Sequence, residues 1–221
     1  MVPATGFTFL NKLSKSNNRE WFNENKTEFK KVEAEMKLFF NGVFADLNLI
    51  DDLESLKIFR IYKDVRFSKD KTPYKINFSA GVVRTKPQNR GGFYLHIENN
   101  KSFIGGGFWE PNKEDLFRIR KEFELDVEEI QEIENQDTFK NYFGKITGDE
   151  LKTAPKGFDK EHQNIEYIRK KQFLVTRTFS NKEVLSDTFE EEIVKTYKAM
   201  LPFFNYMSAV LTTNLNGESI L

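Results

Sequence analysis

The fold class follows from GFYLHIENNKSFIGGGFW, residues 92–109. Its first part alternates apolar and polar side chains, and a period of two is typical of a strand whose two faces differ. Tyr94, His96 and Glu98 therefore share one face of this strand. The link at 98–101 is built from turn-forming residues, and a second strand-like run follows it. Because strands joined by so short a link are antiparallel neighbours, the stretch predicts a β-hairpin.

Similar runs, rich in aromatic and β-branched residues, flank this hairpin on both sides. They cover residues 57–63, 76–85 and 172–179. The link at 86–91, Lys-Pro-Gln-Asn-Arg-Gly, is again short and rich in turn-forming residues. We therefore expect a mainly antiparallel central sheet in which consecutive strands lie side by side, a meander.

Helical periodicity precedes these strands and returns after them. Apolar residues spaced by three, four and seven predict a long helix over about 18–47 and a shorter one around 7–13. Asn17 and Glu20 stand at capping-box spacing in front of the long helix. A further helical pattern begins after Pro111.

The last part of the chain also predicts helix. Ser180 and Glu183 form a capping box in front of a helical region that runs to about Thr213. We expect this region to break near Pro202, because proline lacks the N–H that a helix needs. These signals indicate one α+β domain over residues 1–221, with N- and C-terminal helices packed on the sheet.

Composition limits the class of protein. The 221 residues include 34 Lys+Arg and 34 Asp+Glu, a net charge of zero that disfavours a strongly basic nucleic-acid binder. The 23 Phe residues predict a Phe-rich core. The lack of cysteine excludes disulfides, thiolate nucleophiles and Cys-based zinc sites.

Residues 1–13 do not have the pattern of a secretory signal. The most apolar stretch, 201–211, has about half the length that a bilayer span needs. We therefore expect a cytoplasmic protein without membrane contact.

A cationic segment stands out in this neutral chain. Residues 57–75 hold seven basic side chains against Asp64 and Asp70, and seven minus two gives a local charge of +5. The second half of the segment has no helical period, and Pro73 holds the preceding residue extended. A cationic loop between strands is suited to binding an anion. The same charges could instead pair with Asp64, Asp70 and the acidic stretch 126–137, which has six carboxylates and no basic residue.

Within this segment the run RIYKDVRFSKDKTPY, residues 60–74, resembles the signature of the DUF2461 family of uncharacterised proteins. Other stretches that match in order are residues 17–22, 92–98, 105–111, Arg120 and 151–162. The resemblance implies a single domain of this length, found in bacteria, in which the basic segment matters to all members. It implies no reaction. Lys63 departs from the family pattern, where arginine is usual, and a lysine cannot hold an anion in the bidentate manner of a guanidinium.

We expect the basic segment to bind a small anionic ligand that bears phosphate or carboxylate groups. Arg66 and Lys71 would clamp those groups, and Tyr74 or Tyr94 would donate hydrogen bonds to them. We expect Asp64 and Arg66 to be partly buried beside their aromatic neighbours. The pair could be purely structural, or the carboxylate could equally aim the guanidinium into a cleft. The candidate binding residues are Arg60, Asp64, Arg66, Lys71, Tyr74, Tyr94, His96, Arg120, Lys156, His162 and Arg169.

Other recognised chemistries lack support in the sequence. His96 and His162, with Asp64 or Glu98, could supply two nitrogens and a carboxylate to a metal. The short spacing of a metal motif is missing, so we expect hydrogen-bonded histidines and neither a metal nor a cofactor. His162 could also orient a phosphate or act as an acid or base. Residues 105–107, three glycines, lack the spacing of a nucleotide fingerprint and favour a β-bulge or a close approach of backbone or ligand.

Two alternatives to the small-anion site remain. Basic residues alternate with aromatic ones in Arg60, Tyr62, Arg66, Phe67 and Tyr74, a pattern that could stack bases and neutralise phosphates in a nucleic acid, or bind an acidic protein surface. The neutral net charge counts against a long nucleic-acid footprint. In the other alternative, the segment is a structural network of ion pairs that holds the sheet to its helices. No Walker A loop and no Gly-x-Ser-x-Gly elbow is present.

Overall fold

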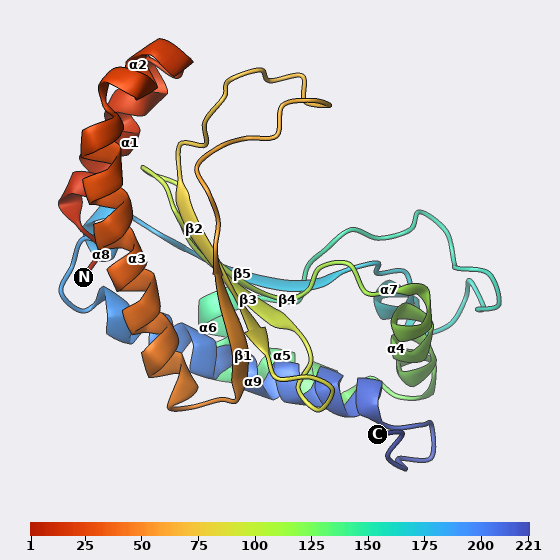
Figure 1. The fold of residues 1–221 in the computed structure, drawn as a ribbon. Coiled ribbons are helices and arrows are strands. Elements are labelled where there is room, and N and C mark those ends of the chain that lie inside the picture. Colours follow the sequence, from red (N-terminus) through yellow and green to blue (C-terminus); the bar gives the residue numbers. More distant parts are fainter.

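The computed structural model describes residues 1–221 and contains one five-stranded antiparallel sheet. The strands follow each other across it in chain order, so the predicted meander is confirmed (Figure 1). They are β1 (Leu53–Ile58), β2 (Phe78–Arg84), β3 (Gly92–Ile97), β4 (Ser102–Phe108) and β5 (Phe173–Phe179). The first strand ends at Ile58, earlier than expected, because the chain leaves the sheet there to form a protruding arm.

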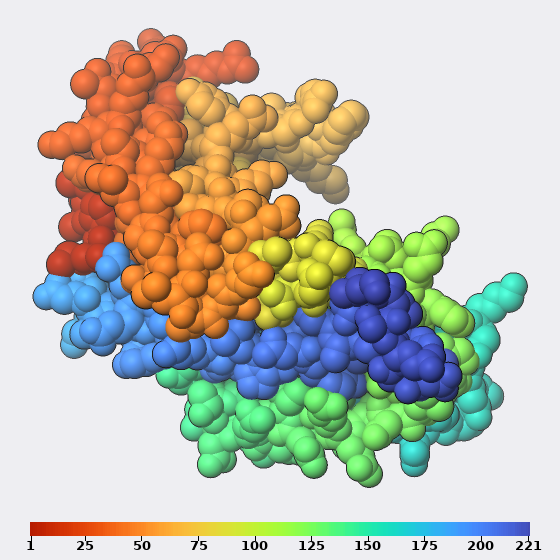
Figure 2. All heavy atoms as spheres, turned by 60° about the horizontal axis from the view of Figure 1, so that its bottom comes forward, coloured from red at the N-terminus to blue at the C-terminus, as the bar shows by residue number.

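Helices flank the sheet at both ends of the chain, as the periodicity predicts. They are α1 (Ala4–Lys15), α2 (Arg19–Glu24), α3 (Lys26–Asn48), α4 (Lys113–Leu125), α5 (Glu128–Asn135), α6 (Asp137–Phe143), α7 (Ile165–Ile168), α8 (Asn181–Val184) and α9 (Phe189–Thr212). The two long helices, α3 and α9, contact each other and one face of the sheet. In the space-filling view they lie side by side in orange and blue, with α5 and α6 in green beyond α9 (Figure 2).

The two faces of the sheet have different surroundings because side chains alternate along each strand. Val82, Phe93, Gly106 and Val175 are cross-strand neighbours on the face toward the helices. An added Cβ on Gly106 would lie 2.6 Å from the sulfur of Met200 in α9, which shows how closely that helix packs. The predicted Phe-rich core lies between this face and the helices. The opposite face carries Tyr94 and its neighbours.

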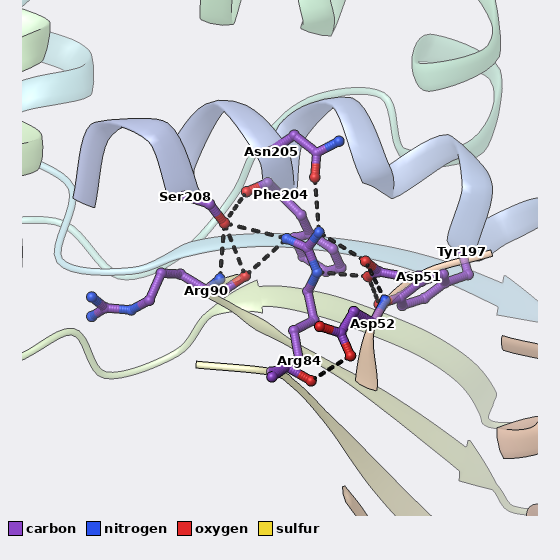
Figure 3. Close-up of polar contacts among 9 residues, drawn as sticks. Asp51, Asp52, Arg84, Arg90, Tyr197, Phe204, Asn205 and Ser208 are labelled. Carbon is purple, nitrogen blue, oxygen red and sulfur yellow. Dashed lines mark hydrogen bonds and ion pairs between the residues drawn. The ribbon is translucent and has the colours of Figure 1, made fainter. Parts of the chain in front are cut away.

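A buried ion pair ties β2 to the helical layer. Arg84 is 2% exposed, and its guanidinium donates to Asp51 through Nε (2.6 Å to Oδ2) and Nη2 (3.1 Å to Oδ1). It also donates to Oδ1 of Asn205 at 2.8 Å and to Oγ of Ser208 at 3.3 Å, both on α9 (Figure 3). Every guanidinium nitrogen therefore has a partner, as a buried charge requires. Neither residue of the pair stands out in the sequence.

Two local expectations about helix ends are wrong. The long N-terminal helix is divided at Asn25 into α2 and α3, and its cap is Asn18, which accepts from the N–H of Trp21 at 2.9 Å. Asn17 instead hydrogen-bonds the backbone of Tyr74, so a tertiary contact takes the residue that local spacing assigned to the cap.

The C-terminal helical region also differs from the prediction. The capping box of Ser180 and Glu183 is present, but it begins only the short α8. Helix α9 then continues through Pro202 to Thr212. Buried residues on both sides of the proline, including Met200 and Phe203, hold the helix against the core, which offsets the lost hydrogen bond.

No helix in the structure combines the length and the apolar character that a membrane span needs.

Candidate ligand-binding groove

A groove of about 540 Å³ runs across the face of the sheet that the long helices leave open. Its lining comes from the five strands and the residues next to them, and no helix contributes to it. Clefts that bind small molecules typically measure about 300–1,000 Å³, so the groove has room for such a ligand.

Strand register explains why the sheet is hollow here. One cross-strand row runs Lys57, Gly81, Tyr94, Gly105 and Thr176. Two of its five members are glycines that leave the floor without side chains. A Cβ added to Gly105 would make only ordinary contact, 3.6 Å from the ring of Phe103. The groove is therefore a gap between side chains rather than a separation of backbones.

Aromatic and aliphatic side chains form the walls. Phe59 packs edge-on against Tyr94 with ring centres 5.9 Å apart, and Tyr94 lies 5.7 Å from the ring of Phe103. Trp109, 64% exposed, and Leu174 line the far end. Transfer of an apolar ligand body from water to these surfaces would therefore be favourable.

Two lysines stand at the end of the groove beside Phe59. The Nζ of Lys57 lies 5.3 Å from the centre of the Phe59 ring, and that of Lys75 lies 5.4 Å from it. Neither lysine, nor neighbouring Arg60, belongs to any ion pair of the structure. Burial lowers the pKa of Lys75, and the nearby charge of Arg60 lowers it further. This end of the groove thus carries unneutralised positive charge.

Tyr94, His96 and Glu98 form a line of hydrogen-bonded side chains, the polar relay, that begins at the groove. The hydroxyl of Tyr94 lies 3.2 Å from Nδ1 of His96, and Nε2 of His96 lies 2.9 Å from Oε2 of Glu98. The side chains of His96 and Glu98 are each 13% exposed. The shared strand face of these three residues, predicted from the alternation in 92–98, is confirmed.

Most of the basic segment lies in an arm, residues 59–77, that protrudes from the ends of β1 and β2 (light orange in Figures 1 and 2). An isolated antiparallel bridge between Tyr62 and Tyr74 joins its outgoing and returning segments. Asn17 fixes its base, because the side-chain amide donates to the carbonyl of Tyr74 at 2.9 Å and accepts from the N–H of Tyr74 at 3.2 Å. Tyr74 is 4% exposed and stacks on Phe22 at 3.9 Å, and burial raises its pKa.

Part of the positive charge of the arm is neutralised within it. Asp64 accepts from Arg66 at 2.6 Å, and Asp70 accepts from Lys63 at 2.7 Å. The expectation that Asp64 and Arg66 are partly buried is wrong, since their side chains are 51% and 76% exposed. Their aromatic neighbour Phe67 points outward and is itself 96% exposed.

The acidic stretch takes no part in neutralising the arm. Glu134 of α5 instead accepts from the hydroxyl of Tyr167 and from the N–H of Ile146.

Lys71 donates to the carbonyl of Val65 at 3.0 Å. A second, polar hollow, which includes Asn17, Arg19 and Lys71, lies between the arm and the start of α2.

The remaining predicted residues lie apart from the groove lining. Arg120 donates to the backbone carbonyls of Ile168 and Lys170, and burial lowers its pKa. Arg169 lies 3.7 Å from Glu150, while its buried Nε has no partner. Lys156 is exposed in a turn, and Nδ1 of His162 accepts from the N–H of Asn164 at 3.1 Å. No three His, Asp or Glu side chains gather into a group that could hold a metal ion.

Of the eleven predicted residues, the structure brings Tyr94 into the groove lining, places His96 behind it and puts Arg60 next to Phe59 at its cationic end. Lining residues that the sequence did not single out include Phe59, Gly81, Leu174 and Thr176. Alternation marks their strands, but only the pairing register brings them together.

Comparison with known proteins identifies the family of the chain. The model of a family described as "Conserved hypothetical protein (DUF2461)" matches residues 5–206. No curated protein and no solved structure matches the chain.

Proposed function

The chain belongs to the DUF2461 family, whose description carries no activity, and we propose that its function is to bind a small organic anion with an apolar body. The body would lie on the open face of the sheet, over Gly105 and against the ring of Phe59. The anionic group, a carboxylate or phosphate, would lie between Lys57 and Lys75. The anionic ligand expected from the basic segment would then bind at the base of the arm.

The observation that carries the proposal is the pairing of an apolar groove with two lysines that have no carboxylate partner. Ion pairs occupy Lys63 and Arg66 of the same segment, whereas Lys57 and Lys75, like neighbouring Arg60, have none. Lys57 lines the groove, and Lys75 lies 5.4 Å from the ring of Phe59, which also lines it. A charge held near an apolar wall interacts more strongly with an incoming anion than one in open water. The apolar walls favour a ligand that has more than a charged group.

Decanoate and its uncharged counterpart 1-decanol test this proposal. We expect decanoate to bind more tightly in isothermal titration calorimetry, because only it has a charge for the two lysines. Lys57→Met and Lys75→Met should each weaken decanoate binding by about 1 kcal/mol, roughly fivefold in Kd, and leave decanol unaffected. Lys69→Met removes a charge from the same segment outside the groove lining and is the matched control.

A second variant tests the apolar half of the site. Gly105→Leu places a side chain on the groove floor, where the Cβ position meets no close atom, so the fold should survive. Binding of both probes should be lost. Equal affinity for decanoate and decanol, or unchanged binding in Gly105→Leu with cooperative unfolding retained, would refute the proposed function.

Single-stranded nucleic acid is the second candidate, favoured by one observation. The open sheet face presents Phe59, Tyr94 and Phe103 beside cations, and aromatic rings on such a face can stack bases. Binding of a labelled ten-nucleotide oligothymidine that weakens steeply with salt, together with failure of decanoate to bind, would support this candidate instead.

A further inference from the structure

The hydrogen-bonded residues Tyr94, His96 and Glu98 run away from the groove, and the proposed function gives them no role. Tyr94, His96 and Glu98 occupy alternate positions along the chain, so their side chains stand in a line on one face. Tyr94 lines the groove at one end of this line. At the other end Glu98 accepts from His96, and Lys101 lies 3.6 Å from its second oxygen. The line therefore connects the groove to a fixed carboxylate.

The charge state of His96 determines what Tyr94 can offer to a ligand. When the imidazole is neutral, its Nε2–H donates to Glu98, and Nδ1 is left as an acceptor. The hydroxyl of Tyr94 must then donate to Nδ1 and can only accept from a ligand. When the imidazole is protonated, Nδ1–H donates to the phenol oxygen. The Tyr94 proton is then free to be donated into the groove.

The surroundings of His96 hold the ring in the position this exchange requires. The imidazole stacks on Phe103 of β4 with centres 4.8 Å apart and planes 19° apart. Its cross-strand neighbour on β2 is Ser79, which carries no charge. Glu98 is its only carboxylate partner, and Lys101 reaches Glu98 rather than the ring. The ring is therefore fixed between one acceptor and one hydroxyl.

Tyr94 is also well placed to reach an anionic group. In the cross-strand row, Gly81 alone stands between Lys57 and Tyr94, two strand spacings of about 4.8 Å each. The ring of Phe59 lies over Gly81, 3.4 Å from where a Cβ would be, and this ring has Lys57 on one side and the phenol of Tyr94 on another. A ligand lying on the Phe59 ring could place its anionic group within reach of both.

We infer that Tyr94, His96 and Glu98 form a proton-linked recognition element, in which a carboxylate ligand binds together with one proton taken up by His96. The inference rests on the proposed function and adds a preference for ligands that carry a carboxylate acceptor. The proton comes from solvent, passes to Nδ1 of His96, and leaves the Tyr94 O–H directed at the ligand carboxylate. Ligands without an acceptor at that position would bind without proton uptake.

The sign of the pH dependence follows from this exchange. A ligand that binds better to the protonated ring takes up a proton as it binds, so its affinity falls as pH rises over the range in which the free ring is neutral and the bound ring is protonated. The decrease reaches at most tenfold per pH unit for one proton. Below that range both states are protonated, and the affinity no longer changes with pH through this residue.

Calorimetry in two buffers of different ionisation enthalpy measures the number of protons taken up with decanoate. We expect up to one proton for the wild type within the sensitive range. Tyr94→Phe keeps the ring in the groove and should still bind decanoate, but with no proton uptake and a flatter pH profile. His162→Gln removes the other histidine of the chain and should behave as the wild type. Lys75→Met should keep the uptake, which separates His96 from the lysine.

Imidazole ¹⁵N NMR identifies the group that is protonated, because the chain has two histidines and His162→Gln leaves only His96. Decanoate should convert His96 from an imidazole with one protonated nitrogen to one with two. Decanoate binding without proton uptake, or uptake that persists in Tyr94→Phe, would overturn this inference and leave the proposed function standing. Absence of decanoate binding at every pH would overturn both.

Discussion

The hydroxyl of Tyr197 in α9 donates a 2.7 Å hydrogen bond to Oδ2 of Asp51, the carboxylate oxygen that also accepts from Arg84 at 2.6 Å. Asp51 lies just after α3, and Arg84 ends β2, so this carboxylate joins three separate parts of the chain. Burial, together with the hydrogen bond to Asp51, raises the pKa of Tyr197 well above its usual value, and the phenol remains a donor. The network is on the helical side of the sheet, opposite the groove.

Asp51→Ala should destabilise the fold by about 3–5 kcal/mol, because it leaves the buried charge of Arg84 without its counterion. Urea denaturation measures the loss. Lys12→Met, which breaks the exposed pair with Glu28, is the control and should cost at most about 1 kcal/mol. A loss of less than about 1 kcal/mol in Asp51→Ala would show that the network does not hold these elements together.

Asn17→Ala should loosen the basic arm more than the rest of the molecule. The substitution removes both hydrogen bonds to the backbone of Tyr74, at a cost of about 1–3 kcal/mol. Trypsin should then cleave faster after Arg66 and Lys69, which lie beyond that anchor. Asn23→Ala, at an exposed position of α2, is the control. Equal cleavage rates in the two variants would contradict an anchoring role for Asn17.

The arm should also respond to acid through Asp70. Hydrogen bonds from Lys63, then from the backbone and side chain of Thr72, hold the pKa of Asp70 well below its usual value. The charged form is therefore favoured in the folded arm. Its stabilising effect is full above the unfolded pKa and is lost as pH falls through the lower folded pKa.

Lys63→Met tests this assignment, because it removes the largest cause of the shift. Carboxyl ¹³C NMR should show the pKa of Asp70 rising toward its ordinary value of 3.8. Lys69→Met, which removes a neighbouring charge without a contact to Asp70, should leave that pKa in place. A titration of Asp70 that is the same in wild type and Lys63→Met would mean that the pair does not form in solution.

The features predicted correctly from the sequence are those that depend on near neighbours. Alternation and short links are enough to place β2, β3 and β4 in a meander, and the capping box of Ser180 and Glu183 lies within four residues. Tertiary contacts decide the features that were missed. Asn17 is taken by Tyr74, 57 positions away, and α9 continues through Pro202 because packing holds both of its sides.

The candidate site was only partly predictable for the same reason. Tyr94, His96 and Glu98 lie on one strand, so their shared face could be read from alternation. The groove also needs Lys57, Gly81 and Gly105, which lie on three other strands. A shift of one residue in any pairing would turn that strand's side chains to the other face, and no local pattern sets the register. The basic segment borders the groove, but its charge count could not separate the ion-paired cations from the free ones.

The three consecutive glycines give a sharp test of the two-sided sheet. At Gly105 a Cβ would enter the groove with no contact closer than 3.6 Å, so Gly105→Ala should be neutral or stabilise by about 0.5–1 kcal/mol. At Gly106 it would lie 2.6 Å from the sulfur of Met200 and 2.8 Å from Phe204, so Gly106→Ala should cost about 1–3 kcal/mol through overpacking. At Gly107 it would meet the backbone oxygen of Phe173 at 2.1 Å, where φ is +131°.

Gly107→Ala should therefore be the most destabilising of the three, because a backbone atom cannot rotate away as the end of a methionine can. Thermal unfolding of the three variants should give the order Gly105→Ala, Gly106→Ala, Gly107→Ala from most to least stable. The same series separates stability from binding, since of these three positions only 105 projects a side chain over the groove floor. A Gly105→Ala variant that is the least stable would show that this face is packed rather than open, and the proposed groove would not exist.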